Sequence, residues 1–249
     1  MTDSVVTLQS VSPEILLIRM EDKLHKNTFT PALIAGLQQA FADIAHYPQA
    51  RVVVITGYEN YYSTGGTKEG LLALQRNQGT FVDANVYTLA LDCALPVISA
   101  MQGHAIGGGL VMGLFSDIVI LGRESIYAAN FMKYGFTPGM GSTHVLPARL
   151  GMGLAQEMFY TSRNYRGEEL ARRGVACEVV PRAEVLGRAL EVARMLAEKP
   201  RLTLSIFKQH MTRQLRAGMK EAIEHELAMH QSTMHQSEVV DRIERLFGN

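Results

Sequence analysis

The sequence predicts an α/β fold, with a parallel sheet built from βαβ units followed by a helical C-terminal region. Short apolar, β-branched runs alternate with a helix-period segment and glycine-rich turns over residues 14–121, an order typical of parallel strands joined by right-handed crossovers. From about residue 151 onward the start and stop signals are those of helices. We therefore expect a core over residues 1–200 and a helical region over residues 201–249.

Four runs have the length and composition of buried strands, which are short, apolar and rich in β-branched residues. They are Glu14–Met20, Arg51–Gly57, Pro96–Met101 and Asp117–Leu121. The last two are separated by a glycine-rich turn and a short helix, so we expect them to run parallel.

Helix signals occupy the intervals and the C-terminal part of the chain. Thr30 is expected to cap a helix that has Pro31 at its first position and apolar residues at helical spacing, namely Leu33, Leu37, Phe41 and Ile44. Ser237 is expected to cap a last amphipathic turn. Other predicted helices are Gly153–Thr161, Gly167–Arg173, Ala183–Glu198 and further helices through residues 201–249.

The composition excludes several classes of protein. The 249 residues include 24 Lys and Arg against 24 Asp and Glu, so no basic field is available to hold a nucleic acid backbone. A leader with a basic and then an apolar segment is absent, as is any run of about 18 apolar residues, which predicts a cytoplasmic protein without a membrane partner. Cys93 and Cys177 lack CxxC spacing, so we expect reduced thiols rather than a disulfide or a metal site.

Two glycine-centred turns carry the main chemical signal. Tyr61–Glu69 (YYSTGGTKE) follows the second predicted strand, and Gly103–Gly109 (GHAIGGG) follows the third and leads into an apolar helix. Glycine lets a backbone approach a ligand closely, and free N–H groups at a helix start can point at a negative oxygen. For either turn alone, tight packing is the commoner explanation. Neither turn fits GxGxxG or a phosphate-loop lysine pattern, so nucleotide binding is not expected.

Together the two turns resemble the crotonase (enoyl-CoA hydratase/isomerase) superfamily. The resemblance consists of the aromatic–x–x–G–x turn, the later PVI-x-A-x-x-G-x-x-x-GGG and the segment Phe136–Gly141 (FTPGMG). It implies a crotonase-type ββα spiral core with a helical C-terminal trimerisation region. It also implies an oxyanion hole in which the amides of Gly66 and Gly108 surround a thioester carbonyl. Two fixed N–H dipoles aimed at a developing enolate oxygen are worth several kcal/mol.

Apolar residues occupy the places where hydratases of this superfamily carry two glutamates. By the resemblance these positions are Val111 and Phe131, and no acidic residue occurs between Glu124 and Glu157. Activating water or moving an α-proton needs a positioned base. Hydration and ordinary double-bond isomerisation are therefore disfavoured.

The segments ALDCALPVISAMQGHAIGGG and ANFMKYGFTPGMG resemble the decarboxylating branch found in polyketide β-branching cassettes. That branch converts 3-methylglutaconyl thioesters on acyl carrier protein to 3-methylcrotonyl thioesters, which implies the same reaction and partner here. The departing CO2 supplies the electron pair and an oxyanion hole stabilises the dienolate, so this chemistry needs no carboxylate base. The substrate would be carried on phosphopantetheine of the carrier protein or on coenzyme A, with no separate cofactor.

His230 is the preferred catalytic side chain. It shares one face of a predicted helix with Ile223, Leu227 and Met234, where a histidine is more often a satisfied core residue. The decarboxylating branch, however, has a functional histidine in its C-terminal helix. The resemblance thus implies that His230 donates a proton to the dienolate or contacts the substrate carboxylate.

Two cations compete for contact with the substrate carboxylate. Lys68 lies two residues past Gly66, although a solvated loop lysine is an equally good explanation. The branch usually carries its lysine in the stretch that is Gly70–Val82 here, which contains no lysine and only Arg76. Either residue could take this role, or the contact is dispensable.

Two other functions stay open. One is a coenzyme A thioester isomerase or hydratase with an unusual base such as Glu69. The other is a non-catalytic scaffold with the crotonase fold. The two oxyanion glycines and the inward-facing His230 argue against a scaffold, which needs neither.

Overall fold

Six strands form the larger of two sheets in the computed structural model, which describes residues 4–248. All neighbouring strands are parallel except the first pair. The order across the sheet is β1 (Val6–Ser12), β2 (Ile15–Met20), β3 (Val52–Thr56), β5 (Val97–Met101), β7 (Ile118–Gly122) and β10 (Glu178–Val180). The four predicted strands are confirmed as β2, β3, β5 and β7. The sequence did not reveal β1, because most of its side chains are exposed or half-buried and many are polar.

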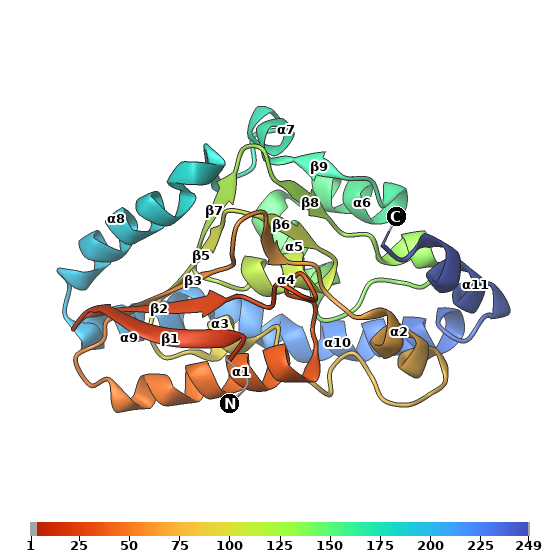
Figure 1. The fold of residues 1–249 in the computed structure, drawn as a ribbon, viewed down its shortest axis with the longest axis horizontal. Coiled ribbons are helices and arrows are strands. Elements are labelled where there is room, and N and C mark those ends of the chain that lie inside the picture. Colours follow the sequence, from red (N-terminus) through yellow and green to blue (C-terminus); the bar gives the residue numbers. More distant parts are fainter. Residues whose placement is uncertain (1–3, 249) are drawn as a thin grey trace.

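A second sheet stands beside the first and is built from very short strands (Figure 1). Its order is β4 (Tyr61–Ser63), β6 (His104–Ile106), β8 (Ile126–Ala128) and β9 (Tyr165–Arg166). β3, β5 and β7 of the large sheet are each followed by a strand of the small sheet, and helices come after the first two such pairs: α2 (Lys68–Gln75) and α3 (Leu89–Asp92), then α4 (Gly108–Leu114). The chain therefore winds as a ββα spiral, which confirms the predicted core.

The first helix, α1 (Pro31–Asp43), begins as predicted. The Thr30 side chain accepts a hydrogen bond from the Leu33 amide at 3.2 Å, and Pro31 occupies the first position, where its missing N–H costs nothing. The inward face of α1 buries Leu33 and Leu37. A short 3-10 turn, η1 (Ile44–His46), follows directly.

Helices cover both faces of the large sheet. The outer face is covered by α8 (Val185–Ala197), whose buried small residues pack on β3, β5 and β7. The opposite face meets α4, which is buried along its whole length between the two sheets. The remaining elements of this part are α5 (Ser142–Leu150), α6 (Met152–Thr161), α7 (Gly167–Arg172) and the 3-10 turns η2 (Phe131–Tyr134) and η3 (Arg182–Glu184).

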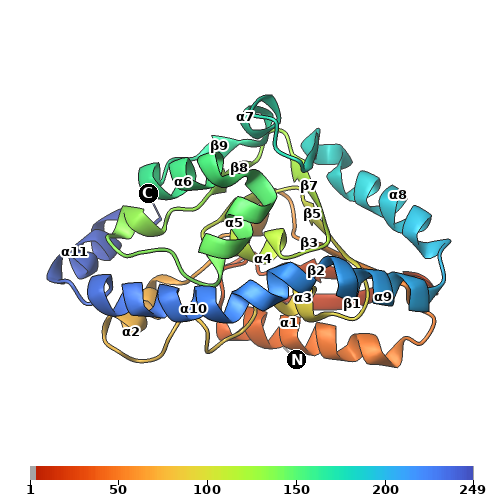
Figure 2. The same cartoon turned by 180° about the vertical axis from the view of Figure 1, so that it is seen from behind.

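Three helices form the C-terminal region, as predicted: α9 (Arg201–Met211), α10 (Arg213–Thr233) and α11 (Ser237–Leu246). The long α10 packs along α5, and α11 packs on α2 and η2 (Figures 1 and 2). Ser237 does not cap α11: it is the first helical residue, and Gln236 stands at the cap without a side-chain hydrogen bond. No helix among residues 4–248 is both long and apolar enough to cross a bilayer.

A buried ion pair fastens α9 to the large sheet. Lys208 is buried, and its Nζ lies 2.8 Å from Asp117 Oδ2 while donating to the carbonyl oxygens of Ala90 at 2.7 Å and Leu95 at 2.9 Å. Asp117 also accepts a hydrogen bond from the Val97 amide at 2.8 Å. Since every donor on the Lys208 ammonium is occupied, this buried charge is well compensated.

Lys208→Met is expected to lower the free energy of unfolding by about 3 kcal/mol, because it leaves the Asp117 carboxylate without its buried partner. Equilibrium urea denaturation measures the change. The control is Lys220→Met. The Lys220 side chain is 88% exposed and lies 3.9 Å from Glu224, so its removal should have almost no effect. Equal losses in the two variants would contradict the structural role of Lys208.

Candidate active site

The two glycine-centred turns meet backbone to backbone because β4 and β6 are neighbouring parallel strands. A Cβ atom on Gly109 would lie 2.1 Å from the carbonyl oxygen of Ser63. A Cβ on Gly65, whose φ is +78°, would lie 2.7 Å from the carbonyl oxygen of Ile106 and 3.0 Å from the Gly108 amide nitrogen. Any side chain at these positions would force the turns apart, so glycine is required at both.

A buried asparagine anchors the loop that adjoins these turns. The Asn27 amide donates to the carbonyl oxygens of Met20 at 3.1 Å and Tyr62 at 2.9 Å, and its oxygen accepts from the Asp22 amide at 2.7 Å. The Phe29 amide then donates to the Gly65 carbonyl at 2.7 Å. These bonds hold the first glycine turn against the end of β2, so its amides keep a fixed direction.

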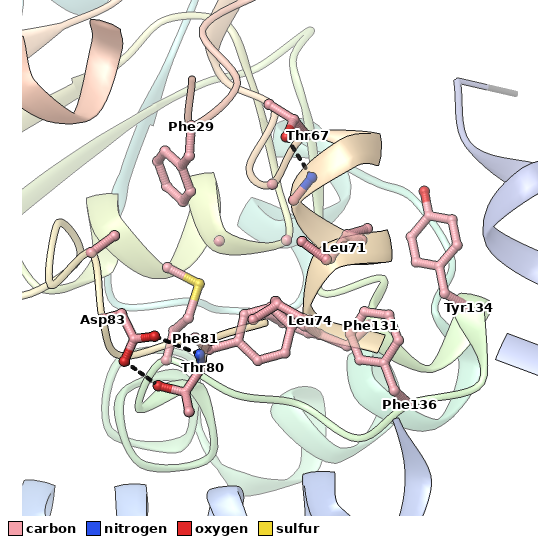
Figure 3. A pocket seen from close by; sticks show the side chains of 18 of the residues that line it. Phe29, Thr67, Leu71, Leu74, Thr80, Phe81, Asp83, Phe131, Tyr134 and Phe136 are labelled. Carbon is pink, nitrogen blue, oxygen red and sulfur yellow. Dashed lines mark hydrogen bonds between the residues drawn. The ribbon is translucent and has the colours of Figure 1, made fainter. Parts of the chain in front are cut away.

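Gly66 and Gly108 line one cavity of about 310 Å³. Figure 3 shows other side chains of its wall, among them Phe29, Leu71 and Phe131. Within residues 4–248 neither amide donates a hydrogen bond to another protein group, so both are available to a ligand. The structure therefore brings the two predicted oxyanion glycines together. Most other wall residues are apolar and include Phe29, Leu71, Leu74, Phe81, Val86, Phe131, Phe136, Met140 and Phe247.

Only one of the two residues expected at the hydratase glutamate positions lies at the cavity. Phe131, at the start of η2, lines the cavity. Val111 is fully buried in α4 and is not among the residues that line the cavity. Neither position can hold or activate a water molecule as a carboxylate does.

One carboxylate does reach the cavity wall. Asp83 lies at the rim, where it accepts hydrogen bonds from the Thr80 amide and from Thr80 Oγ1, both at 2.6 Å (Figure 3). These bonds stabilise the ionised form and lower the pKa of Asp83. Both carboxylate oxygens are thus engaged in closing a turn.

His230 is buried on α10 beside the cavity rather than in its wall. Its Nε2 donates to the Thr137 carbonyl oxygen at 2.7 Å, and its ring centroid lies 4.7 Å from that of Phe81. Burial lowers the pKa of His230, since the imidazolium is costly to desolvate. The residue lines a neighbouring cavity of about 190 Å³.

Glu226 was missed by sequence reasoning, although it sets the position of α10. It is buried one helical turn before His230 and accepts hydrogen bonds from the amides of Gly141 at 2.7 Å and Thr143 at 2.9 Å, at the start of α5. Burial raises the pKa of this carboxyl group. Its place on the inward stripe of α10, four residues before His230, was the one available signal.

The two candidate cations do not line the cavity. Lys68, the first residue of α2, forms an ion pair with Glu244 of α11. Arg76 stands exposed at the C-terminal end of α2. In the described part of the chain no Lys, Arg or His lines this cavity, and no group of three His, Cys, Asp or Glu could hold a metal ion.

The chain matches the family model described as enoyl-CoA hydratase/isomerase over residues 11–245. It is 53% identical, over the full length of both chains, to the bacillaene synthase decarboxylase PksI of Bacillus subtilis. A solved structure described as part of a dehydratase/decarboxylase enzyme couple in polyketide β-branching has a TM-score of 0.97 and 53% identity, covering 99% of this chain and 100% of that one. The ECH2 decarboxylase domain of CurF from Lyngbya majuscula has a TM-score of 0.94 and 44% identity, covering 98% and 100% respectively.

Hydration of crotonyl-coenzyme A should be negligible, because the two positions expected to carry the hydratase glutamates hold Val111 and Phe131, and neither side chain can act as a base on water. The loss of crotonyl absorbance on adding purified protein measures this. Restoring Glu at both positions need not create activity, since the surrounding cavity remains apolar. Ready hydration by the wild-type protein would contradict this account of the cavity.

Proposed function

Because this chain belongs to the enoyl-CoA hydratase/isomerase family, we propose that it decarboxylates an acyl thioester in polyketide β-branching. The substrate is a 3-methylglutaconyl-type thioester on acyl carrier protein and the product is a 3-methylcrotonyl-type thioester. Similarity to the decarboxylases at 53% and 44% identity supports this reaction. The observation that carries it is a pair of unengaged glycine amides in an apolar cavity, with Phe131 in the wall where the resemblance implies a glutamate in hydratases.

The proposed reaction needs stabilisation of negative charge and one proton. The bond between the substrate's γ-carbon and its carboxylate breaks, and CO2 leaves. The electron pair moves through the conjugated system to the thioester oxygen, where the amides of Gly66 and Gly108 stabilise the dienolate. Such preorganised donors are commonly worth about 3 kcal/mol each in transition-state stabilisation. A proton added to the γ-carbon then completes the product.

His230 supplies that proton in this proposal. Its Nε2 is occupied by the Thr137 carbonyl, so in this proposal Nδ1 delivers the proton. Burial favours the neutral ring, but a substrate carboxylate brought close to it stabilises the imidazolium. Substrate binding would thus favour protonation of His230. After CO2 has left, the imidazolium would give its proton to the dienolate.

Neither candidate cation for the carboxylate contact lines the acyl cavity. Lys68 could approach the substrate only by leaving Glu244, and Arg76 is exposed at the end of the same helix. Glu69, the alternative base for an isomerase, is exposed and lies outside the cavity wall. Nothing in the described residues favours isomerisation over decarboxylation.

The protein works as a homotrimer with acyl carrier protein in the cytoplasm. Acyl carrier protein delivers the substrate, and the cytoplasm is where such a carrier works. A homotrimer is supported by large apolar side chains that α9 leaves exposed, namely Leu202, Ile206, Phe207 and Met211.

Mass spectrometry of 3-methylglutaconyl carrier protein should reveal loss of CO2 after incubation with the wild-type protein. His230→Ala should slow single-turnover decarboxylation by about 10²–10⁴, the usual effect of removing a positioned acid, while binding changes much less. His225→Ala is the matched control, because His225 lies on the same helix but is exposed. A wild-type rate for His230→Ala would return His230 to a packing role.

Substitutions of the two cations separate their roles. If Lys68 holds the carboxylate, Lys68→Ala should weaken substrate binding, Lys68→Arg should retain part of it, and Glu244→Gln should not weaken it because the ion pair competes for Lys68. Binding titrations with a non-reactive dicarboxylic thioester measure this. An inert Lys68→Ala together with an impaired Arg76→Ala would assign the contact to Arg76.

A further inference from the structure

The acyl cavity and the His230 cavity are neighbours with a shared wall. Within residues 4–248 the side chains or backbones common to both are Leu74, Gly79, Thr80 and Phe81. His230 lines only the second cavity. A substrate held by the glycine amides is therefore separated from the proposed proton donor by this wall.

Phe81 is the aromatic part of the wall and contacts His230 directly. Its ring centroid lies 4.7 Å from the His230 ring and 5.7 Å from the Phe136 ring. A Cβ atom built on Gly139 would lie 2.3 Å from His230 Cε1 and 3.2 Å from Phe81 Cδ2. Both rings thus pack on the same glycine, and Phe81 covers His230 on the side of the acyl cavity.

The segment that carries Phe81 is suited to move as a unit. Gly79 has a φ of +112°, which gives the backbone a freedom that other residues lack. The two hydrogen bonds from Thr80 to Asp83 close the following turn, and Phe81 is only half-buried. Rotation of the Phe81 side chain, or displacement of the turn about Gly79, would join the two cavities.

We propose that Phe81 is a gate, and that the carboxylate-bearing arm of the substrate must displace it to reach His230. Phe81 is then a positioning and specificity-determining residue for the proposed decarboxylation, on which this inference rests. A thioester without the carboxylate fits the acyl cavity with the gate closed. A dicarboxylic thioester bears the cost of opening the gate, and its apparent affinity falls by the fraction of molecules in the open state.

Phe81→Leu should therefore strengthen the binding of glutaryl pantetheine. This saturated dicarboxylic thioester cannot form a dienolate and so stays intact during a titration. With an open state populated to about 10% or less, the expected gain in affinity is about tenfold or more. The affinity for butyryl pantetheine, which lacks the carboxylate, should change much less, and its binding shows that the variant's cavity is intact.

Phe29→Leu is the matched control, because Phe29 lines the acyl cavity next to Gly108 but not the His230 cavity. It should change both affinities by similar factors. Weaker glutaryl binding in Phe81→Leu, or equal changes for the two ligands, would overturn the gate. If Phe81→Leu fails to fold, Phe81→Met provides the same comparison with a flexible side chain.

NMR of the histidine rings gives a second measurement on the wild-type protein. The His230 signal, assigned by its loss in His230→Gln, should shift with glutaryl pantetheine and remain in place with butyryl pantetheine, since Phe81 leaves the ring only in the first complex. Identical spectra in the two complexes would also overturn the gate. Decarboxylation is assayed separately, so an inactive wild-type protein with a moving Phe81 would reject the proposed function and not the gate.

Discussion

The close approach of two backbone turns is the constraint on which the rest of this molecule depends. Gly65 lies against the backbone of Ile106 and Gly108, and Gly109 lies against that of Ser63, at distances that exclude any side chain. The contact joins the ends of two parallel strands in the small sheet. It places the amides of Gly66 and Gly108 in one cavity, whereas side chains at positions 65 and 109 would force the two turns apart. The ββα spiral fixes this contact because it places β4 and β6 side by side.

The cavity around that contact is specialised by what its walls lack. Phe131 contributes an apolar side chain to the wall and Val111 is buried in the core, so the proposed thioester would meet hydrogen-bond donors at its carbonyl and apolar surface elsewhere. An apolar wall strengthens the interaction between the amides and a developing oxyanion, because little water competes for it. The same wall disfavours a free carboxylate, which accords with a reaction in which the carboxylate leaves as CO2.

The C-terminal helices complete the site, although they are distant in sequence from the glycine turns. Lys208 binds α9 to the start of β7, Glu226 binds α10 to the start of α5, and Lys68 binds α2 to α11 through Glu244. Each anchor pairs a charge with backbone groups or an opposite charge, so the helices have defined positions over an otherwise apolar core. His230 owes its place beside the acyl cavity to the Glu226 anchor one turn earlier.

Local patterns in the chain were sufficient for the main strands and the first helix, whereas the pairing of Gly66 with Gly108 in one cavity was expected from the family resemblance. The apolar runs of β2, β3, β5 and β7 and the cap at Thr30 act through neighbours in sequence, so their signals are local. The strand β1 and the small sheet were not recognised, because exposed or three-residue strands carry almost no periodic signal. The roles of Lys68, Asp83 and Phe81 depend on partners distant in sequence or on the shape of a loop: Glu244 for Lys68, Thr80 for Asp83 and the two adjoining cavities for Phe81. The contacts of Lys68 and Phe81 arise only when the spiral closes and α10 and α11 pack over it, which is why only the tertiary structure decided them.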